Sequence, residues 1–291
     1  MIEPKPAARL RSVLFAPAVR EDMIPKLTRS EPDGVVIDCE DATPIAQKAA
    51  GRSNAMEFAP RIMGQGSEVF VRINPPGSAW FHDDVAYGLH EKLDGVVVPM
   101  VETVDGLDLV AKTLAANEIG HLGIIAGLET ALGVADARQL LAHPQVIAAY
   151  FGAEDFVADM GGVRTERNAE VHHARSVVAL AGRLANKPVI DQIVANFRDD
   201  DRMRRETAMA RALGFKGKLC IHPGQVAVAN QGFLPSEEEV DRALRLLAAY
   251  EIGIASGVSA IDFEGQMVDE PLASQARQVL VAAGIEAENR P

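Results

Sequence analysis

Residues 95–126 read GVVVPMVETVDGLDLVAKTLAANEIGHLGIIA, and this stretch decides the fold. It begins with the apolar run Gly95–Pro99 and ends with a second one, Leu122–Ala126. Near-continuous apolar runs are typical of parallel strands that are buried on both faces. Between them, from Leu107 onward, apolar residues recur at i, i+3, i+4 and i+7, as in an amphipathic helix over Val104–Asn117. The stretch therefore predicts a strand–helix–strand unit.

The same alternation runs along most of the chain. The predicted strands are Ser12–Phe15, Gly34–Asp38, Glu68–Ile73, Gly95–Pro99, Leu122–Ala126, Val146–Phe151, Pro188–Asp191 and Lys218–Ile221. Eight strand–helix units in succession favour a (β/α)8 TIM barrel, which we expect over residues 9–232. The alternative, an open doubly wound sheet, usually carries GxGxxG after its first strand, and here APAVRED follows it.

Residues 233–291 predict a C-terminal extension made of a helix, a hairpin and a second helix. Ser236 and Glu239 form a capping box at the start of the first helix. The hairpin is expected over Ala260–Asp269, and the last helix begins at Pro271. A segment of this size is too small for a sturdy domain by itself, so we expect it to act as a lid that packs on the barrel or on a neighbouring subunit.

Composition narrows the class of protein. A hydrophobic content of 48% excludes a disordered or fibrous chain, and a formal charge of −12 argues against a nucleic-acid partner. No apolar run is long enough to span a membrane, and the N-terminus, MIEPKPAARLRS, shows no signal peptide. The two cysteines, Cys39 and Cys220, cannot form a disulfide framework. We therefore expect a cytoplasmic protein.

Acidic residues follow several predicted strands, at the end of the barrel where reactive residues gather. Those of interest are Glu40, Asp41, Glu102, Glu129 and Asp155, with Arg72 among them. Unpaired carboxylates that face one another repel, so a divalent cation is their natural counter-charge. Oxygen ligands suit Mg²⁺, with Mn²⁺ as an alternative, rather than zinc.

These residues also have structural interpretations. The acids could stabilise the N-termini of the helices that follow them. Arg72 lies in an apolar strand, where an unpaired charge is costly, so it either pairs with an acid at the rim or binds a substrate carboxylate. Glu129 and Asp155 are not expected in the core.

Five segments together resemble the citrate lyase β-subunit family of acyl-CoA lyases, in the HpcH/HpaI aldolase superfamily. They are Arg11–Pro17, Asp38–Ala42, Val71–Pro75, Tyr150–Asp155 and Gly214–Pro223. The resemblance runs from about residue 9 to about residue 280. That family also contains malyl-CoA, citramalyl-CoA and β-methylmalyl-CoA lyases.

The resemblance implies roles for particular residues. Glu129 and Asp155 would hold Mg²⁺ at the substrate, and Arg72 would bind the carboxylate of the 2-oxo acid, with Glu40 and Asp41 also expected in catalysis.

Coenzyme A would be received by the end of the first strand and the helix after it. Phe15 and Lys26 match those positions, and Ile221-His222 match a stretch that lines the acyl-CoA channel. Asp22 stands at a nearby position that is often basic in relatives, and Met100 replaces a lysine that is frequent there.

Asp269 would be the acid–base residue on a lid that reaches a neighbouring subunit's site, in a homotrimer or a multiple of it.

The implied reaction is Mg²⁺-dependent cleavage or formation of a 3-hydroxyacyl-CoA thioester of the citramalyl-CoA, malyl-CoA or citryl-CoA type. Its products would be acetyl-CoA, or a close homologue, and a 2-oxo acid. One alternative is a metal-dependent pyruvate aldolase, although that branch uses a Glu-His dipeptide where this chain has Glu40-Asp41. Others are a citrate lyase subunit acting on a carrier-bound substrate and a non-catalytic acyl-CoA-binding protein.

Overall fold

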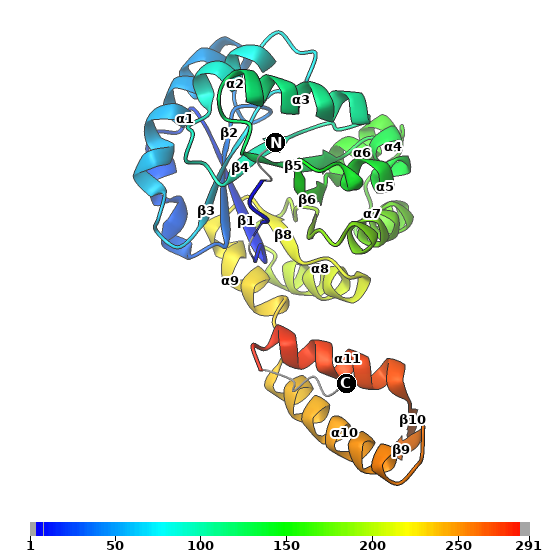
Figure 1. Ribbon diagram of the computed structural model, residues 1–291. Coiled ribbons are helices and arrows are strands. Elements are labelled where there is room, and N and C mark those ends of the chain that lie inside the picture. The colour runs from blue at the N-terminus through cyan, green and yellow to red at the C-terminus, as the bar shows by residue number, and fades with distance from the viewer. Residues whose placement is uncertain (1–3, 8, 286–291) are drawn as a thin grey trace. The chain divides into compact units, whose positions relative to one another are not determined.

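The computed structural model describes residues 4–7 and 9–285. By internal contacts the chain divides into two compact units, Met1–Phe233 and Leu234–Pro291. The first unit is a closed barrel of parallel strands in the order β1 to β8, which confirms the predicted (β/α)8 fold (Figure 1). None of the helices in the described part of the chain is long and apolar enough to cross a membrane.

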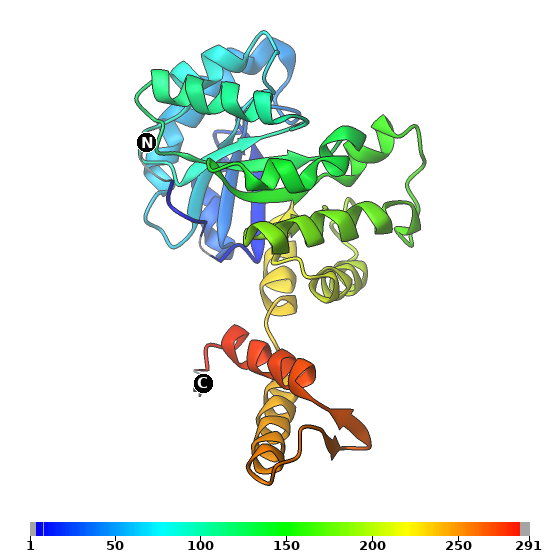
Figure 2. The same ribbon diagram turned by 45° about the vertical axis from the view of Figure 1, so that its right-hand side comes forward.

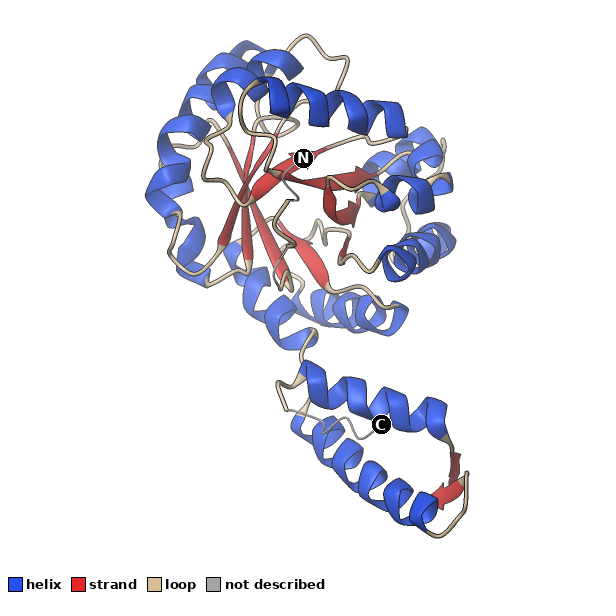
Figure 3. Ribbon diagram, viewed as in Figure 1, coloured by secondary structure: helices blue, strands red, loops and turns tan. Residues whose placement is uncertain are grey.

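The barrel strands agree with the predicted runs to within two residues at each end. They are β1 Ser12–Pro17, β2 Gly34–Asp38, β3 Glu68–Arg72, β4 Gly95–Val98, β5 Gly123–Leu128, β6 Val146–Phe151, β7 Val189–Asp191 and β8 Gly217–Cys220. Figure 3 shows these strands enclosed by helices. The helices are α1 Lys48–Ile62, α2 Phe81–Gly88, α3 Val104–Ala116, α4 Ala131–Ala135, α5 Ala137–Ala142, α6 Ala153–Asp159, α7 His172–Ala185, α8 Asp200–Leu213 and α9 Pro223–Gly232.

Three connections contain short 3-10 helices: η1 Ile24–Ser30, η2 Ile45–Gln47 and η3 Ala169–Val171. The helix that follows the first strand is a 3-10 helix rather than an α-helix, since β1 leads into η1. Pro25 lies in the first turn of η1, and Glu31 ends it with a left-handed backbone at φ 55°.

The barrel is filled by alternate residues of its strands. Val36, Phe70, Ile125 and Tyr150 belong to an inner cluster, whereas their chain neighbours pack outward against the helices. Because side chains alternate along a strand, the next inward position after Phe70 is Arg72 and the next after Val36 is Asp38. The same alternation that fills the barrel thus places polar side chains at its carboxyl end.

The second unit consists of α10 Glu237–Ala255, the strands β9 Ile261–Phe263 and β10 Gln266–Val268, and α11 Glu270–Ala282. Figure 2 shows the hairpin between the two helices. The predicted capping box is present, since the Ser236 hydroxyl accepts from the Glu239 N–H at 3.1 Å. The unit has its own small core, which includes Leu246, Tyr250 and Leu280. The helix–hairpin–helix prediction is confirmed.

Candidate active site

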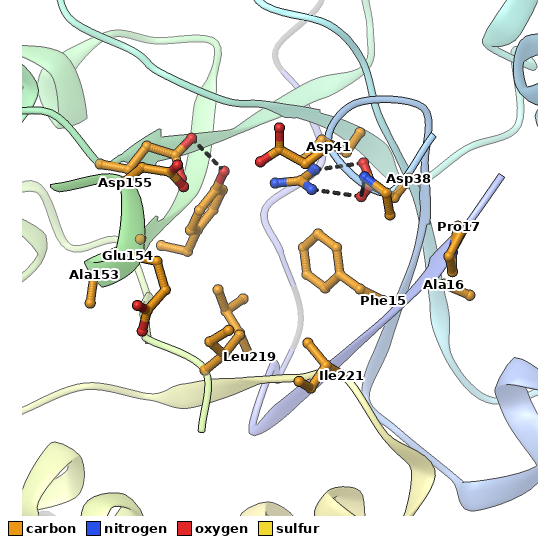
Figure 4. A pocket seen from close by; sticks show the side chains of 16 residues that line it. Phe15, Ala16, Pro17, Asp38, Asp41, Ala153, Glu154, Asp155, Leu219 and Ile221 are labelled. Atoms are coloured by element: carbon orange, nitrogen blue, oxygen red, sulfur yellow. Dashed lines mark hydrogen bonds and ion pairs between the residues drawn. The ribbon is translucent and has the colours of Figure 1, made fainter. Parts of the chain in front are cut away.

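A pocket of about 500 Å³ opens at the carboxyl ends of the barrel strands. Its lining includes the predicted residues Phe15, Asp41, Arg72, Glu129, Asp155 and Ile221. Figure 4 shows Asp155, Asp41 and Asp38 along one side, Leu219 and Ile221 along the other, and Phe15 between them. The pocket therefore has an acidic wall and an apolar wall.

Glu129 follows β5 and is only 2% exposed, so the expectation that it lies outside the core is wrong. Its Oε1 accepts hydrogen bonds from the Met100 N–H at 2.7 Å and from the Tyr150 hydroxyl at 2.9 Å. Two glycines make room for this carboxylate. A Cβ at Gly152 would lie 2.3 Å from Glu129 Oε2, and one at Gly127 would lie 2.5 Å from the Tyr150 hydroxyl. A built cradle therefore holds Glu129.

The two acids proposed as metal ligands both have raised pKa values. Burial raises the pKa of Glu129 to about 7, and the nearby Asp155 carboxylate adds to the effect. The pKa of Asp155 is also raised, first by burial and then by the charge of Asp41. A bound cation would offset both penalties.

The donor set fits Mg²⁺. Within residues 4–7 and 9–285, no three acidic, histidine or cysteine side chains form a closed metal cage. A cation here would have Glu129 and Asp155 from the protein and would take its other oxygens from water and substrate. Mg²⁺ is usually held in this way, by one or two carboxylates.

The Arg72 guanidinium is paired with acidic side chains. Its Nε and Nη2 donate to the two Asp38 oxygens at 2.7 and 2.6 Å, and its Nη1 lies 3.3 Å from Glu40 Oε2. The guanidinium also lies over the Phe15 ring, 5.3 Å from its centroid. Pairing with an acid at the rim is therefore what the structure shows, and the guanidinium still lines the pocket.

Glu40 and Asp41 lie in the loop after β2 and do not cap a helix, because η2 and α1 begin several residues later. Burial raises the pKa of Glu40 to about 7, against the opposing charge of Arg72. The Lys48 ammonium holds this loop through the Cys39 and Glu40 carbonyls, at 3.0 and 2.8 Å. Lys48 is thus a positioning residue for the acidic wall.

Of the four residues expected to receive coenzyme A, two line the pocket and two are exposed outside it. Phe15 and Ile221 line the pocket, whereas Lys26 is exposed in η1. His222 is exposed and caps α9, its Nδ1 accepting from the Gly224 N–H at 3.1 Å. Its ring stacks on Phe197, with 4.8 Å between the centroids.

Asp22, at the position expected to be basic, is bonded to Arg20 at 2.9 and 3.1 Å. Arg20 is therefore a positive charge beside Asp22, after the first strand, that sequence reasoning did not identify.

Asp269 belongs to the second unit and directly precedes α11. Its side chain makes no capping hydrogen bond. Its Oδ1 is buried and has no hydrogen-bond partner in the described part of the chain.

Sequence reasoning also missed Asp38 and Tyr150 as site residues, because Asp38 is the last residue of one apolar strand run and Tyr150 the penultimate residue of another. The signal that finds them is strand alternation. Asp38 shares the inward face with Val36, and Tyr150 shares it with Ala148.

Gly152→Ala should displace Glu129 and lower Mn²⁺ affinity and kcat by about 10- to 100-fold, as expected when the support of a metal ligand is lost. The reason is the 2.3 Å approach of the added Cβ to Glu129 Oε2. Mn²⁺ titration followed by electron paramagnetic resonance measures the change. Gly106→Ala is the matched control, since its Cβ would meet only Thr103 Oγ1, at 3.3 Å. Unchanged Mn²⁺ affinity in Gly152→Ala would contradict the cradle.

Comparison with known proteins places these features in a family. A model described as HpcH/HpaI aldolase/citrate lyase matches residues 11–223. The citrate lyase subunit beta-like protein of Deinococcus radiodurans is 47% identical, with 94% of this chain and 98% of that protein covered. The mitochondrial citramalyl-CoA lyase of Homo sapiens is 29% identical, with 94% and 85% covered.

Among solved structures, the CitE protein of Mycobacterium tuberculosis in complex with magnesium, acetoacetate and coenzyme A is similar. It has 30% sequence identity and a TM-score of 0.78, over 96% of this chain and 99% of that chain.

Proposed function

Because this chain belongs to the HpcH/HpaI aldolase/citrate lyase family, we propose that it cleaves or forms a 3-hydroxyacyl-CoA thioester with the help of Mg²⁺. By its family the chain is a carbon–carbon lyase. The proposed substrate is of the malyl-CoA, citramalyl-CoA or citryl-CoA type, and the products are acetyl-CoA or a close homologue and a 2-oxo acid. The observation that carries the proposal is the pair Glu129 and Asp155 beside Arg72 in one pocket.

The pocket can bind the acidic half of such a substrate. Asp38 occupies one edge of the Arg72 guanidinium and fixes its orientation. A carboxylate of the 2-oxo acid would then bind at Nη1, beside Glu40 Oε2, which lies 3.3 Å from the same nitrogen. Glu129 and Asp155 would hold Mg²⁺. When bound, the cation would polarise the substrate oxygens and stabilise the negative charge that develops as the carbon–carbon bond breaks.

The proposed reaction includes two proton transfers, and each requires an acid–base residue. For the substrate hydroxyl we propose the Glu40-Asp41 pair, since a Glu40 carboxyl with a pKa of about 7 can accept and return a proton near neutral pH. For the thioester α-carbon we propose Asp269 of a neighbouring subunit. The unpartnered Oδ1 of Asp269 supports this role. The proposed assembly is accordingly a homotrimer or a multiple of it.

For the coenzyme A half, we propose that Phe15 and Ile221 contact the acyl arm, with Lys26 and His222 farther along the same ligand. Leu219 and Ile193 extend the apolar wall beside them. The buried free thiols of Cys39 and Cys220 fit the reducing cytoplasm proposed as its location.

A panel of condensations tests the function. The purified full chain is mixed with acetyl-CoA or propionyl-CoA and with glyoxylate, pyruvate or oxaloacetate, and products are identified by mass spectrometry. We expect a 3-hydroxyacyl-CoA with Mg²⁺, none after chelation, and recovery on adding Mg²⁺ back. Activity only with a carrier-bound thioester would instead indicate a citrate lyase subunit. Condensation of pyruvate with an aldehyde, without coenzyme A, would indicate the aldolase.

Arg72→Lys should raise the KM for the 2-oxo acid about tenfold or more and change the KM for acyl-CoA much less. Lysine keeps the charge, but it cannot both bind Asp38 through two nitrogens and offer another donor to substrate. Steady-state kinetics with each substrate varied in turn measures the difference. Arg204→Lys, in a surface ion pair with Asp201, is the control. Equal rises in both KM values would show that Arg72 acts mainly through its ion pair.

A further inference from the structure

We propose that Tyr150 and the Met100 N–H determine which metal ion the pocket prefers, because together they occupy one oxygen of Glu129. Glu129 is then left to bind a cation through Oε2 alone. This inference rests on the metal site of the proposed function and adds a specificity-determining residue, Tyr150, to it.

Two separate features of the chain converge on Glu129 Oε1. The Tyr150 hydroxyl donates to it at 2.9 Å, and the Tyr150 side chain is 2% exposed. This hydroxyl is seated where Gly127 has no Cβ, since a Cβ there would lie 2.5 Å away. The Met100 N–H donates to the same oxygen at 2.7 Å, from a left-handed backbone with φ 51°. Non-glycine residues adopt that conformation at a cost, so the fold sustains strain at Met100 beside this hydrogen bond.

The other carboxylate oxygen of Glu129, Oε2, has different surroundings. None of the hydrogen bonds found for Glu129 in the described part of the chain goes to Oε2. Gly152 leaves the space around Oε2 open, and its neighbours Ala153 and Asp155 line the same pocket. The two oxygens of Glu129 are therefore not equivalent: Oε1 is held by the protein, and Oε2 is free to meet a ligand.

This difference between the two oxygens favours metal ions that bind a carboxylate through one oxygen only. Ca²⁺ takes six to eight oxygens and often binds both oxygens of a carboxylate, whereas Mg²⁺ requires octahedral geometry and binds few protein carboxylates. Binding both oxygens of Glu129 would compete with the two donors on Oε1. The arrangement thus disfavours Ca²⁺ relative to Mg²⁺ and Mn²⁺.

The test compares metal affinities in Tyr150→Phe and in the wild-type full chain. Mn²⁺ binding is measured by electron paramagnetic resonance, and Mg²⁺ and Ca²⁺ are then titrated as competitors. Loss of one hydrogen bond, about 1 kcal/mol, should shift the ratio of Ca²⁺ to Mg²⁺ affinity toward Ca²⁺ by about fivefold. Tyr87→Phe, at a tyrosine 66% exposed on α2, should leave the ratio unchanged. An unchanged ratio in Tyr150→Phe, even with all affinities reduced, would overturn the inference.

A second measurement uses the wild type only, in case Tyr150→Phe does not fold. In crystals of the Mn²⁺ complex we expect Glu129 to bind through Oε2 alone, with the Tyr150 hydrogen bond intact. A carboxylate bound through both oxygens, with that hydrogen bond broken, would overturn the inference while leaving the proposed function in place. A wild type that binds neither Mn²⁺ nor Mg²⁺, with or without substrate, would overturn both.

Discussion

Glu129→Gln and Asp155→Asn should each lower kcat by about a thousandfold or more, since each would remove a proposed charged ligand of the ion that would stabilise the transition state. The fold should survive. Gln has the shape of Glu, and its carbonyl oxygen can still accept from the Met100 N–H and the Tyr150 hydroxyl. Circular dichroism and thermal unfolding check the fold, and Mn²⁺ titration checks the metal.

The pH dependence gives a second measurement of the same prediction. Glu129 has a raised pKa, about 7, so a proton competes with the metal ion below that pH. Wild-type Mn²⁺ affinity should fall as the pH drops through 7. In the metal-free protein the charged form is the disfavoured one, so Glu129→Gln should relieve a destabilisation that is present above pH 7 and absent below pH 4.5.

Glu102→Gln serves as the control, because Glu102 is an exposed acid after β4 and is not among the residues that line the pocket. Its activity should stay close to that of the wild type. If chelator-treated wild type kept full activity, the assignment of Glu129 and Asp155 as metal ligands would be wrong.

Asp269→Asn should lower kcat by about 10²- to 10⁴-fold, the usual contribution of a positioned acid–base group. Binding of Mn²⁺ and of acyl-CoA should persist, because their proposed residues lie in the barrel. Isothermal titration of each ligand against the variant separates binding from turnover. Lost acyl-CoA affinity with unchanged kcat would show that Asp269 binds substrate rather than transferring a proton.

Mixing inactive variants tests whether sites are shared between subunits. Asp269→Asn supplies intact barrels and Glu129→Gln supplies intact Asp269, so random exchange in equal amounts should restore up to about a quarter of the sites. Glu129→Gln mixed with Asp155→Asn is the control. Both defects lie in the barrel, and no mixed pair can repair it. No recovery in the first mixture, despite demonstrated exchange, would mean that Asp269 serves its own chain or none.

Most of the fold was predictable because burial leaves a direct trace in sequence. Strands buried on both faces read as continuous apolar runs, and GVVID at Gly34–Asp38 and VIAAYF at Val146–Phe151 were predicted with the bounds observed. The end of β5 was missed because its last residues, Gly127 and Leu128, precede polar residues and look like a turn.

The site was predictable only from the rule that reactive residues of a (β/α)8 barrel lie at the carboxyl ends of its strands. That rule placed Glu129 and Asp155 at one rim, whereas the partner of Arg72 depends on strand register. Asp38 and Arg72 lie directly opposite each other in the β2–β3 pairing, although they are 34 residues apart in sequence. An apolar run shows that a strand exists, but it does not state which residue of the next strand it meets.

The glycine cradle of Glu129 has a consequence for the evolution of related sequences. A chain that keeps the glutamate but carries alanine or serine at the position of Gly127 or Gly152 has no space for the same side-chain rotamer. We expect such a paralogue to bind its metal ion much more weakly, even though all of its acidic residues are present. We therefore expect the residues at these two positions, together with the acidic residues, to distinguish active members from inactive ones.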